Sequence, residues 1–229
     1  MMTSAIIIGR AASRVVKPSR PAATTQLRDD NDRRQRDIAD NFYPTPPEAT
    51  RALLSVEAFD GAIHEPACGE GHIAHELEAA GHTVVATDLN DRGFGRTGLD
   101  FLGQAVPLAP HIVTNPPYGR GLADAFLRKA LLLTRQTGGK VAMLLNLSSL
   151  AEPKRTPLWR SVPPARLYAI DDIVCWPEPH RAPPAHFTRQ LWAVWTPDHR
   201  GPSAFWWLSS AEFRDRPSSH NTKNKRRSS

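Results

Sequence analysis

The 229-residue chain is short of cysteine and has no long apolar run, and both absences exclude classes of protein. Its two cysteines, Cys68 and Cys175, are too few for a disulfide framework or a cysteine-based zinc site, so we expect a reducing, cytoplasmic setting. No stretch is apolar over the ~18 residues that a membrane span requires, so no membrane partner is expected. The histidines between positions 64 and 82 lack well-spaced cysteine or carboxylate partners, and no metal site is predicted.

The basic charge of the chain is concentrated at its two ends. The formal net charge is +6, of which residues 1–40 carry +3 and residues 214–229 carry +5, leaving −2 in between. Both ends lack hydrophobic periodicity, so we interpret residues 1–40 as a disordered segment and 214–229 as a disordered basic tail. The acid-free first 28 residues also resemble a transit peptide, which is the less favoured interpretation. One domain is therefore predicted over residues 41–213, a length that suits a single core.

Within that domain the charge divides again. Residues 41–118 hold 10 acidic and 3 basic side chains, whereas residues 119–213 hold 7 acidic and 12 basic ones. Complementarity of charge favours a cationic ligand in the first half and a polyanion, if one is bound, against the second half.

Strand and helix patterns alternate along the domain. Thr45-Pro46-Pro47-Glu48 predicts a helix start, with Thr45 as the N-cap, Pro46 at the first helical position and Glu48 completing a capping box. Further helices are predicted after Gly71 and from Leu122 to Arg135. Strands are predicted at 62–65, 83–87, 111–114, 140–145, 166–174 and 190–195. Such alternation is typical of a parallel sheet that is covered by helices on both faces.

A glycine-containing turn, Glu65-Pro66-Ala67-Cys68-Gly69-Glu70-Gly71, follows the first predicted strand. Asp88 ends the next strand, 19 positions after Gly69, where a carboxylate is able to bind both hydroxyls of a ribose. The spacing also fits a dinucleotide-dependent oxidoreductase. The acids Glu65 and Glu70 disfavour that interpretation because they would repel a pyrophosphate at the helix N-terminus. S-adenosylmethionine carries no phosphate and bears two cationic groups, so it suits this turn better. A strand–turn–helix unit without a ligand remains an alternative.

Asn115-Pro116-Pro117-Tyr118 follows a short apolar strand and is the strongest candidate for catalysis. Two prolines fix the backbone and remove two donors, which makes the loop stiff. The Asn115 side-chain oxygen and the Pro116 carbonyl could accept the two N–H bonds of a planar amino group and favour a pyramidal, nucleophilic nitrogen. Tyr118 could stack on an extruded base. The alternative is a rigid strand exit with a packed tyrosine.

Together these motifs resemble the class I S-adenosylmethionine-dependent methyltransferases that act on amino groups, above all the compact N6-adenine DNA methyltransferases of phages and prophages. The match covers roughly residues 41–145 and begins with Phe42-Tyr43-Pro44-Thr45-Pro46, which is similar to the family's aromatic-x-Thr-Pro segment. The resemblance implies a Rossmann-like domain with a mostly parallel seven-stranded sheet, one antiparallel strand, and helices on both faces. It also implies methyl transfer to the N6 of adenine in DNA.

The resemblance further implies a set of site residues. Asn115, Pro116, Pro117 and Tyr118 would be catalytic. The cofactor would contact Tyr43, Thr45, Pro46, Glu65, Ala67, Cys68, Gly69, Gly71, Asp88, Leu89, Asp100, Phe101 and Asn115. From the loop 177–189, Arg181 and Arg189 are candidate phosphate contacts alongside Tyr118. The tetrapeptide also occurs in enzymes that methylate RNA bases or a protein amide. Little of the chain is left for a target-recognition region, so the recognition sequence cannot be inferred. The sequence does not indicate the oligomeric state either.

Overall fold

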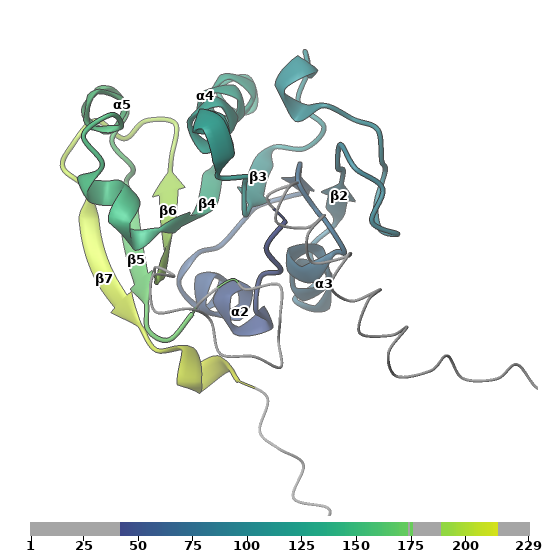
Figure 1. Ribbon diagram of the computed structural model, residues 1–229, viewed down its shortest axis with the longest axis horizontal. Helices are drawn as coiled ribbons and strands as arrows, with labels where there is room; N and C mark the ends of the chain where they lie inside the picture. The colour runs from purple at the N-terminus through teal and green to yellow at the C-terminus, as the bar shows by residue number, and fades with distance from the viewer. Residues whose placement is uncertain (1–41, 174, 176–188, 215–229) are drawn as a thin grey trace, which may run out of the picture.

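A seven-stranded sheet with the order β2-β1-β3-β4-β6-β5-β7 forms the centre of the protein. The computed structural model describes residues 42–173, 175 and 189–214 (Figure 1). β6 pairs antiparallel with both of its neighbours, and the remaining strand pairs are parallel. The strands are β1 Ile63–Glu65, β2 Val84–Ala86, β3 His111–Thr114, β4 Val141–Asn146, β5 Arg166–Ile170, β6 Gln190–Trp195 and β7 Ala204–Leu208. The predicted mixed sheet with one antiparallel strand is confirmed.

Helices cover both faces of the sheet. α2 (Pro47–Val56) and α3 (His72–Ala79) pack on one face, and α4 (Leu122–Thr134) and α5 (Thr156–Ser161) on the other (Figure 1). Short 3-10 turns connect them, namely η1 Phe101–Gly103, η2 Gly119–Gly121, η3 Leu147–Ala151 and η4 Ser210–Phe213. The two layers confirm the Rossmann-like arrangement.

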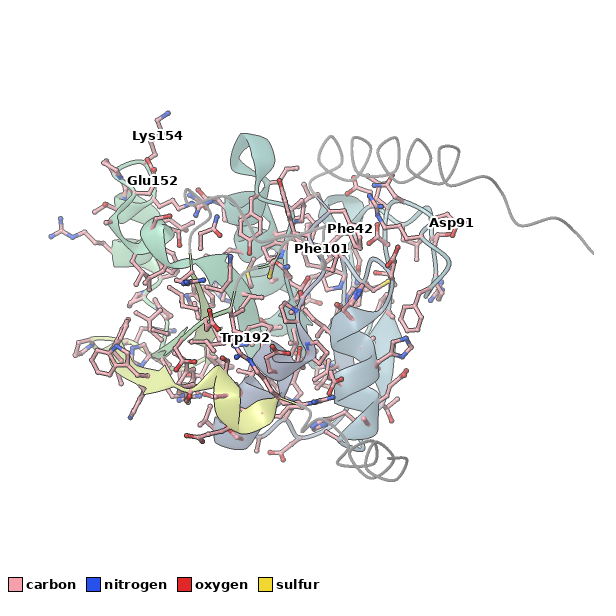
Figure 2. The ribbon with its side chains drawn as sticks, turned by 60° about the horizontal axis from the view of Figure 1, so that its bottom comes forward. Phe42, Asp91, Phe101, Glu152, Lys154 and Trp192 are labelled. Atoms are coloured by element: carbon pink, nitrogen blue, oxygen red, sulfur yellow. The ribbon has the colours of Figure 1, made fainter. Side chains whose placement is uncertain are left out.

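The period of two in the strands explains why there are two separate hydrophobic cores. Along β4, Ala142 and Leu144 belong to the core beneath α2 and α3, whereas Val141, Met143 and Leu145 belong to the core beneath α4. Successive side chains of a strand point to opposite faces, so a strand that is buried on both faces is apolar throughout. Trp192 of β6 is fully buried, and its indole N–H donates to the Ala49 carbonyl of α2 at 2.7 Å. In Figure 2 it lies in the interior, whereas Glu152 and Lys154 project outward.

The strand order reverses between β1 and β3. The chain leaves β1 to form β2 on one side, then returns to form β3 on the other side of β1. At such a reversal the connections diverge and leave a crevice at the carboxyl ends of the strands, where ligands bind in open α/β sheets. The glycine turn follows β1 and the Asn115 loop follows β3. The topology therefore brings the two strongest sequence motifs to the same crevice.

The start of α2 differs from the prediction by one residue. Pro46 is the N-cap and Pro47 is the first helical residue, with no side-chain cap. The predicted Thr45 cap is wrong, because the Thr45 hydroxyl accepts a hydrogen bond from Asn115 at 3.1 Å. Two prolines in sequence each remove a donor, so the first turn has less need of a capping oxygen. The Thr45 hydroxyl is therefore not used by the helix and bonds to Asn115 at the crevice.

At the far edge, β7 pairs in parallel with β5 and was not predicted from the sequence. The ends of the chain predicted to be disordered lie outside the described residues. Arg214, which we had assigned to the basic tail, is described and forms ion pairs with Asp172 at 2.7 Å and Glu48 at 3.5 Å. Over the described ranges, no helix combines the length and the apolar character that crossing a membrane would need.

Candidate active site

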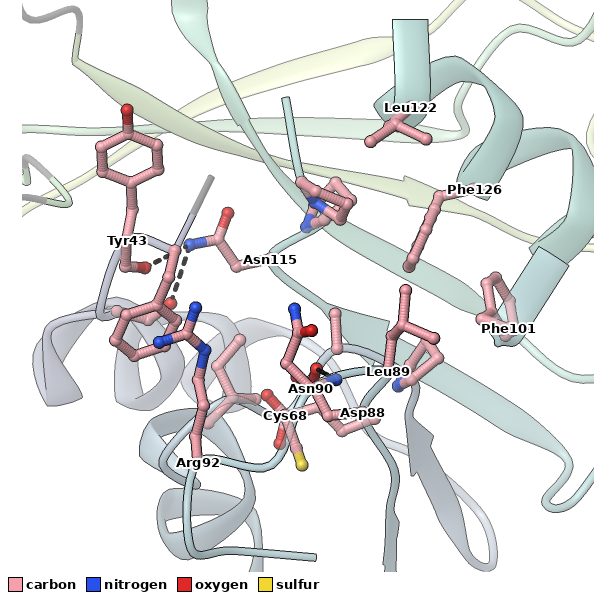
Figure 3. A pocket seen from close by; sticks show the side chains of 18 of the residues that line it. Tyr43, Cys68, Asp88, Leu89, Asn90, Arg92, Phe101, Asn115, Leu122 and Phe126 are labelled. Carbon is pink, nitrogen blue, oxygen red and sulfur yellow. Dashed lines mark hydrogen bonds between the residues drawn. The ribbon is translucent and has the colours of Figure 1, made fainter. Parts of the chain in front are cut away.

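A pocket opens at the carboxyl ends of β1, β2 and β3. It contains about 970 Å³ of space free of protein atoms, part of it open to solvent. Its walls come from the segment before α2, the glycine turn, the loop after β2, η1 and the Asn115 loop, with Leu122 and Phe126 of α4 closing one side (Figure 3). Six segments of the chain thus meet at one site.

The glycine turn forms the floor of the pocket and is fastened to Asp88. Gly69 and Gly71 have φ angles of +55° and +88°, which L side chains rarely adopt. A Cβ on Gly69 would lie 2.4 Å from the ring of Phe42, so only glycine allows this close approach. The Gly69 N–H donates to the Asp88 carboxylate at 2.8 Å, and the Asn90 N–H donates to its other oxygen, also at 2.8 Å. Asp88 is therefore held rigidly beside the turn, with lone pairs left for a ligand.

Glu65 ends β1 and is the most strongly perturbed acid of the pocket. It is 2% exposed, and one carboxyl oxygen is buried without a hydrogen-bond partner. Burial raises the pKa of Glu65 well above its usual range, and Asp88 and Glu78 add to the rise, although the Ala74 N–H opposes it. A buried carboxyl in this state gains by binding either a proton or a cationic ligand. The pocket therefore favours a positively charged group beside Glu65.

The Asn115 side chain has one defined orientation. Its amide nitrogen donates to the Tyr43 carbonyl and to the Thr45 hydroxyl, each at 3.1 Å (Figure 3). A carbonyl can only accept, so the atom that faces Tyr43 must be the NH2 group, and the amide oxygen must point the other way. Cys175 lies 3.7 Å from the same nitrogen. The segment before α2 therefore fixes which atom of Asn115 is presented as an acceptor.

The Tyr118 hydroxyl points inward. It lies 2.7 Å from the Asn115 amide oxygen, 2.9 Å from the Leu144 carbonyl and 3.3 Å from the Gln190 side-chain oxygen. Burial raises the pKa of Tyr118 well above its usual range, so the phenol remains a donor. It has one proton for three acceptors. The Tyr118 hydroxyl therefore lies against the Asn115 amide oxygen, while residue 118 also contributes to the wall of the pocket.

Neither cysteine has the character of a nucleophile. Burial, together with Glu65 and Asp88, raises the pKa of Cys68 to about 12, and burial raises that of Cys175 to about 12. Thiols in this state stay neutral and unreactive. Across the described ranges, no group of three or more His, Cys, Asp or Glu side chains is placed to hold a metal ion. The polar chemistry of the pocket therefore does not rest on a thiolate.

The structure brings most of the predicted site residues together. Those that line the pocket are Tyr43, Thr45, Glu65, Ala67, Cys68, Asp88, Leu89, Asp100, Phe101, Asn115, Pro116, Pro117 and Tyr118. Pro46 caps α2, and Gly69 and Gly71 shape the turn from behind. Arg189 lies away from the pocket, with its side chain 54% exposed and 3.7 Å from Asp172, and Arg181 lies outside the described residues.

Sequence reasoning missed several residues of the pocket wall, among them His72, Asn90, Arg92 and Phe126. His72 directly follows the glycine turn, and Asn90 and Arg92 follow Asp88, so proximity to a motif was an available signal. Phe126 lies on the apolar face of α4, where its 3.6-residue spacing indicates only core packing.

No family model matches the sequence, and no curated protein matches it. Solved structures do. One is described as a modification subunit of a type I restriction enzyme from Vibrio vulnificus YJ016, with 14% identity, a TM-score of 0.47, and coverage of 81% of this chain and 51% of that one. A TehB-like SAM-dependent methyltransferase from Corynebacterium glutamicum has 16% identity, a TM-score of 0.46 and coverage of 75% and 98%. The glycopeptide N-methyltransferase MtfA in complex with S-adenosylmethionine has 20% identity, a TM-score of 0.37 and coverage of 48% and 59%.

This chain therefore spans about half the length of the Vibrio subunit. The three likenesses fall below 25% identity and below a TM-score of 0.5, so they concern the general arrangement of strands and helices and not a substrate. The function has to come from the pocket itself.

Proposed function

We propose that this protein is an S-adenosylmethionine-dependent methyltransferase that modifies an exocyclic amino group, with the N6 of adenine in DNA as its substrate. The observation that carries the proposal is the orientation of Asn115. Its NH2 group is bound to Tyr43 and Thr45, so its oxygen is presented as an acceptor beside Pro116, at the edge of a pocket built on an acidic glycine turn.

The pocket residues fit this cofactor. The unpartnered oxygen of Glu65 suits a cationic ammonium, and the rigid Asp88 carboxylate suits the two ribose hydroxyls. Asp100, Leu89 and Phe101 line a part of the pocket that suits a flat adenine ring with one polar edge. A dinucleotide fits less well because its pyrophosphate would lie beside Glu65 and Glu70 at the start of α3. When bound, S-adenosylmethionine supplies an electrophilic methyl group.

The chain's own residues then have to hold and activate the amino group. The Asn115 oxygen and the Pro116 carbonyl accept its two N–H bonds, which favours a pyramidal nitrogen with a free lone pair. The Asn115 oxygen has two lone pairs, so it can accept from the substrate while Tyr118 donates to the other. The prolines keep both acceptors in place, and most of the rate enhancement comes from this positioning.

Two features of the chain favour DNA as the carrier of the amino group. The tetrapeptide is preceded by an aromatic-x-Thr-Pro segment, which the resemblance associates with DNA adenine enzymes, and the Thr45 of that segment bonds directly to Asn115. The domain's second half and its C-terminal tail are basic, as contact with phosphates requires. RNA bases and protein amides are the alternatives that the same loop could serve.

The direct test is a transfer assay with methyl-labelled S-adenosylmethionine and separate pools of DNA, RNA and protein. We expect label in DNA, recovered as N6-methyladenine after digestion. Label confined to RNA or protein would overturn the DNA assignment but keep the class. If calorimetry detected no binding of S-adenosylmethionine and tight binding of a nicotinamide dinucleotide, the class itself would be wrong.

Replacing Asn115 with alanine tests the role of the tetrapeptide. We expect Asn115→Ala to abolish transfer, a loss of at least about 10²-fold in kcat, because the main acceptor for the amino group is removed. Cofactor affinity, measured by calorimetry, should change little because Asn115 acts mainly on the target nitrogen. Wild-type turnover in this variant would rule out the mechanism.

A further inference from the structure

Arg92 stands at the pocket without a role in the site described above. It lies in the loop that follows β2, four residues after Asp88, and its guanidinium carbon is 4.1 Å from the centre of the Phe42 ring. Phe42 itself packs against Gly69 of the cofactor turn. A cation stacked on an aromatic ring is held in a defined plane.

The charges of the pocket are unequal. Glu65, Asp88 and Asp100 line it, and among the described residues Arg92 is the only lysine or arginine that does so. S-adenosylmethionine has a sulfonium and an ammonium that suit these acids, but it also has a carboxylate that they would repel. A planar guanidinium can bind a carboxylate through two parallel hydrogen bonds. The positive charge of Arg92 would attract the cofactor carboxylate that these acids repel.

The position of Arg92 matches the amino-acid end of the cofactor. Figure 3 shows Arg92 on the side of the pocket where Tyr43 and Asn115 lie, whereas Phe101 and Phe126 lie on the opposite side. The opposite side is apolar and aromatic and suits adenine. The charged methionine end therefore falls on the side of Arg92 and the Asn115 loop.

We infer that Arg92, held in plane by Phe42, is the binding residue for the carboxylate of S-adenosylmethionine. The inference rests on the proposed function, since it concerns the same cofactor site. It adds a residue of the loop after β2 to the site and gives Phe42 a role as the platform that orients it.

Calorimetry with three ligands tests the assignment: S-adenosylmethionine, decarboxylated S-adenosylmethionine, and 5′-deoxy-5′-methylthioadenosine, which lacks the amino-acid portion. Arg92→Ala should weaken S-adenosylmethionine binding by roughly 10- to 100-fold and leave methylthioadenosine binding unchanged. Decarboxylation should weaken wild-type binding by a similar factor and add little in Arg92→Ala, because the two changes remove the same contact. Arg92→Lys should fall between, since it keeps the charge without the paired geometry.

Arg96→Ala is the matched control because it removes the same charge from the same loop, and Arg96 does not line the pocket. We expect wild-type affinities for all three ligands. Unchanged S-adenosylmethionine binding in Arg92→Ala, or an equal loss for methylthioadenosine, would overturn the assignment. A loss seen only in binding of a DNA duplex would also overturn it and make Arg92 a phosphate contact. If the wild-type protein bound neither methylthioadenosine nor S-adenosylmethionine, the proposed cofactor itself would instead be wrong.

Discussion

At the scale of single residues, the proposed mechanism depends on which atom of Asn115 faces the pocket. Thr45 and the Tyr43 carbonyl bind its NH2 group, and the Tyr118 hydroxyl binds its oxygen. In the proposed mechanism, the segment before α2 would thus act by orienting the Asn115 amide as well as by contacting the cofactor. Thr45 is 4% exposed, so removing its hydroxyl takes a buried acceptor away from the Asn115 NH2 group.

Thr45→Val keeps the shape of the side chain and removes this acceptor. We expect kcat to fall about tenfold because a loosened Asn115 misplaces the target nitrogen. Cofactor affinity should change less than kcat. Steady-state kinetics with calorimetry would separate the two effects, and Thr45→Ser, which keeps the hydroxyl, should behave as wild type. A loss of cofactor affinity without a change in kcat would show that Thr45 contacts the cofactor alone.

At the scale of elements, most helices and strands follow from local pattern, and the exceptions have long-range causes. The strands at 111–114 and 190–195 have the expected bounds. β7 was missed because its partner β5 lies more than 30 positions away and its sequence does not alternate. The motif residues of the site could be predicted from spacing. The stacking of Arg92 on Phe42 could not, because it joins segments that no local pattern connects.

β1 carries two buried titratable side chains next to the pocket, His64 and Glu65. Its His64 is 1% exposed, bonds through Nε2 to Thr87 at 2.9 Å, and leaves Nδ1 without a partner. Burial lowers the pKa of His64 to about 4, whereas burial raises that of Glu65. Both side chains are therefore more stable in their neutral forms within the fold, and the two shifts act on stability in opposite directions as the pH changes.

The histidine predicts a loss of stability in weak acid. The unfolded chain protonates His64 near pH 6.5 and the folded chain near pH 4, so its contribution is complete above about pH 6.5 and is lost as the pH falls toward 4. Between pH 7 and pH 5 the free energy of unfolding should fall by about 2 kcal/mol more in wild type than in His64→Gln. Urea titrations at the two pH values measure the difference. An identical pH dependence in wild type and His64→Gln would contradict the assignment.

At the scale of the whole molecule, the acidic and basic halves of the sequence meet at the Asn115 loop. The acidic half supplies β1, β2, β3, α2 and α3, and the basic half supplies α4 and the strands from β4 onward. The loop after β3 lies at the boundary, where a cationic cofactor and a polyanion could approach from different sides. Fine contacts across this boundary do not follow from charge counts. Glu57, for example, binds Arg166, Lys140 and Tyr168, which lie 83 or more positions away.

The distribution of charge leads to a prediction about the C-terminal tail. Residues 214–229 carry six basic side chains and one acid, and four of the six are Lys223, Lys225, Arg226 and Arg227. If these bind phosphates, replacing all four with glutamine should reduce the slope of log affinity against log salt by up to about 3 to 4. Fluorescence anisotropy with a labelled duplex measures the slope. Cofactor affinity and kcat at saturating DNA should stay unchanged, because the tail adds encounter and retention rather than chemistry. An unchanged salt slope would instead place the phosphate contacts on residues 119–213, whose 12 basic side chains could then be replaced in turn.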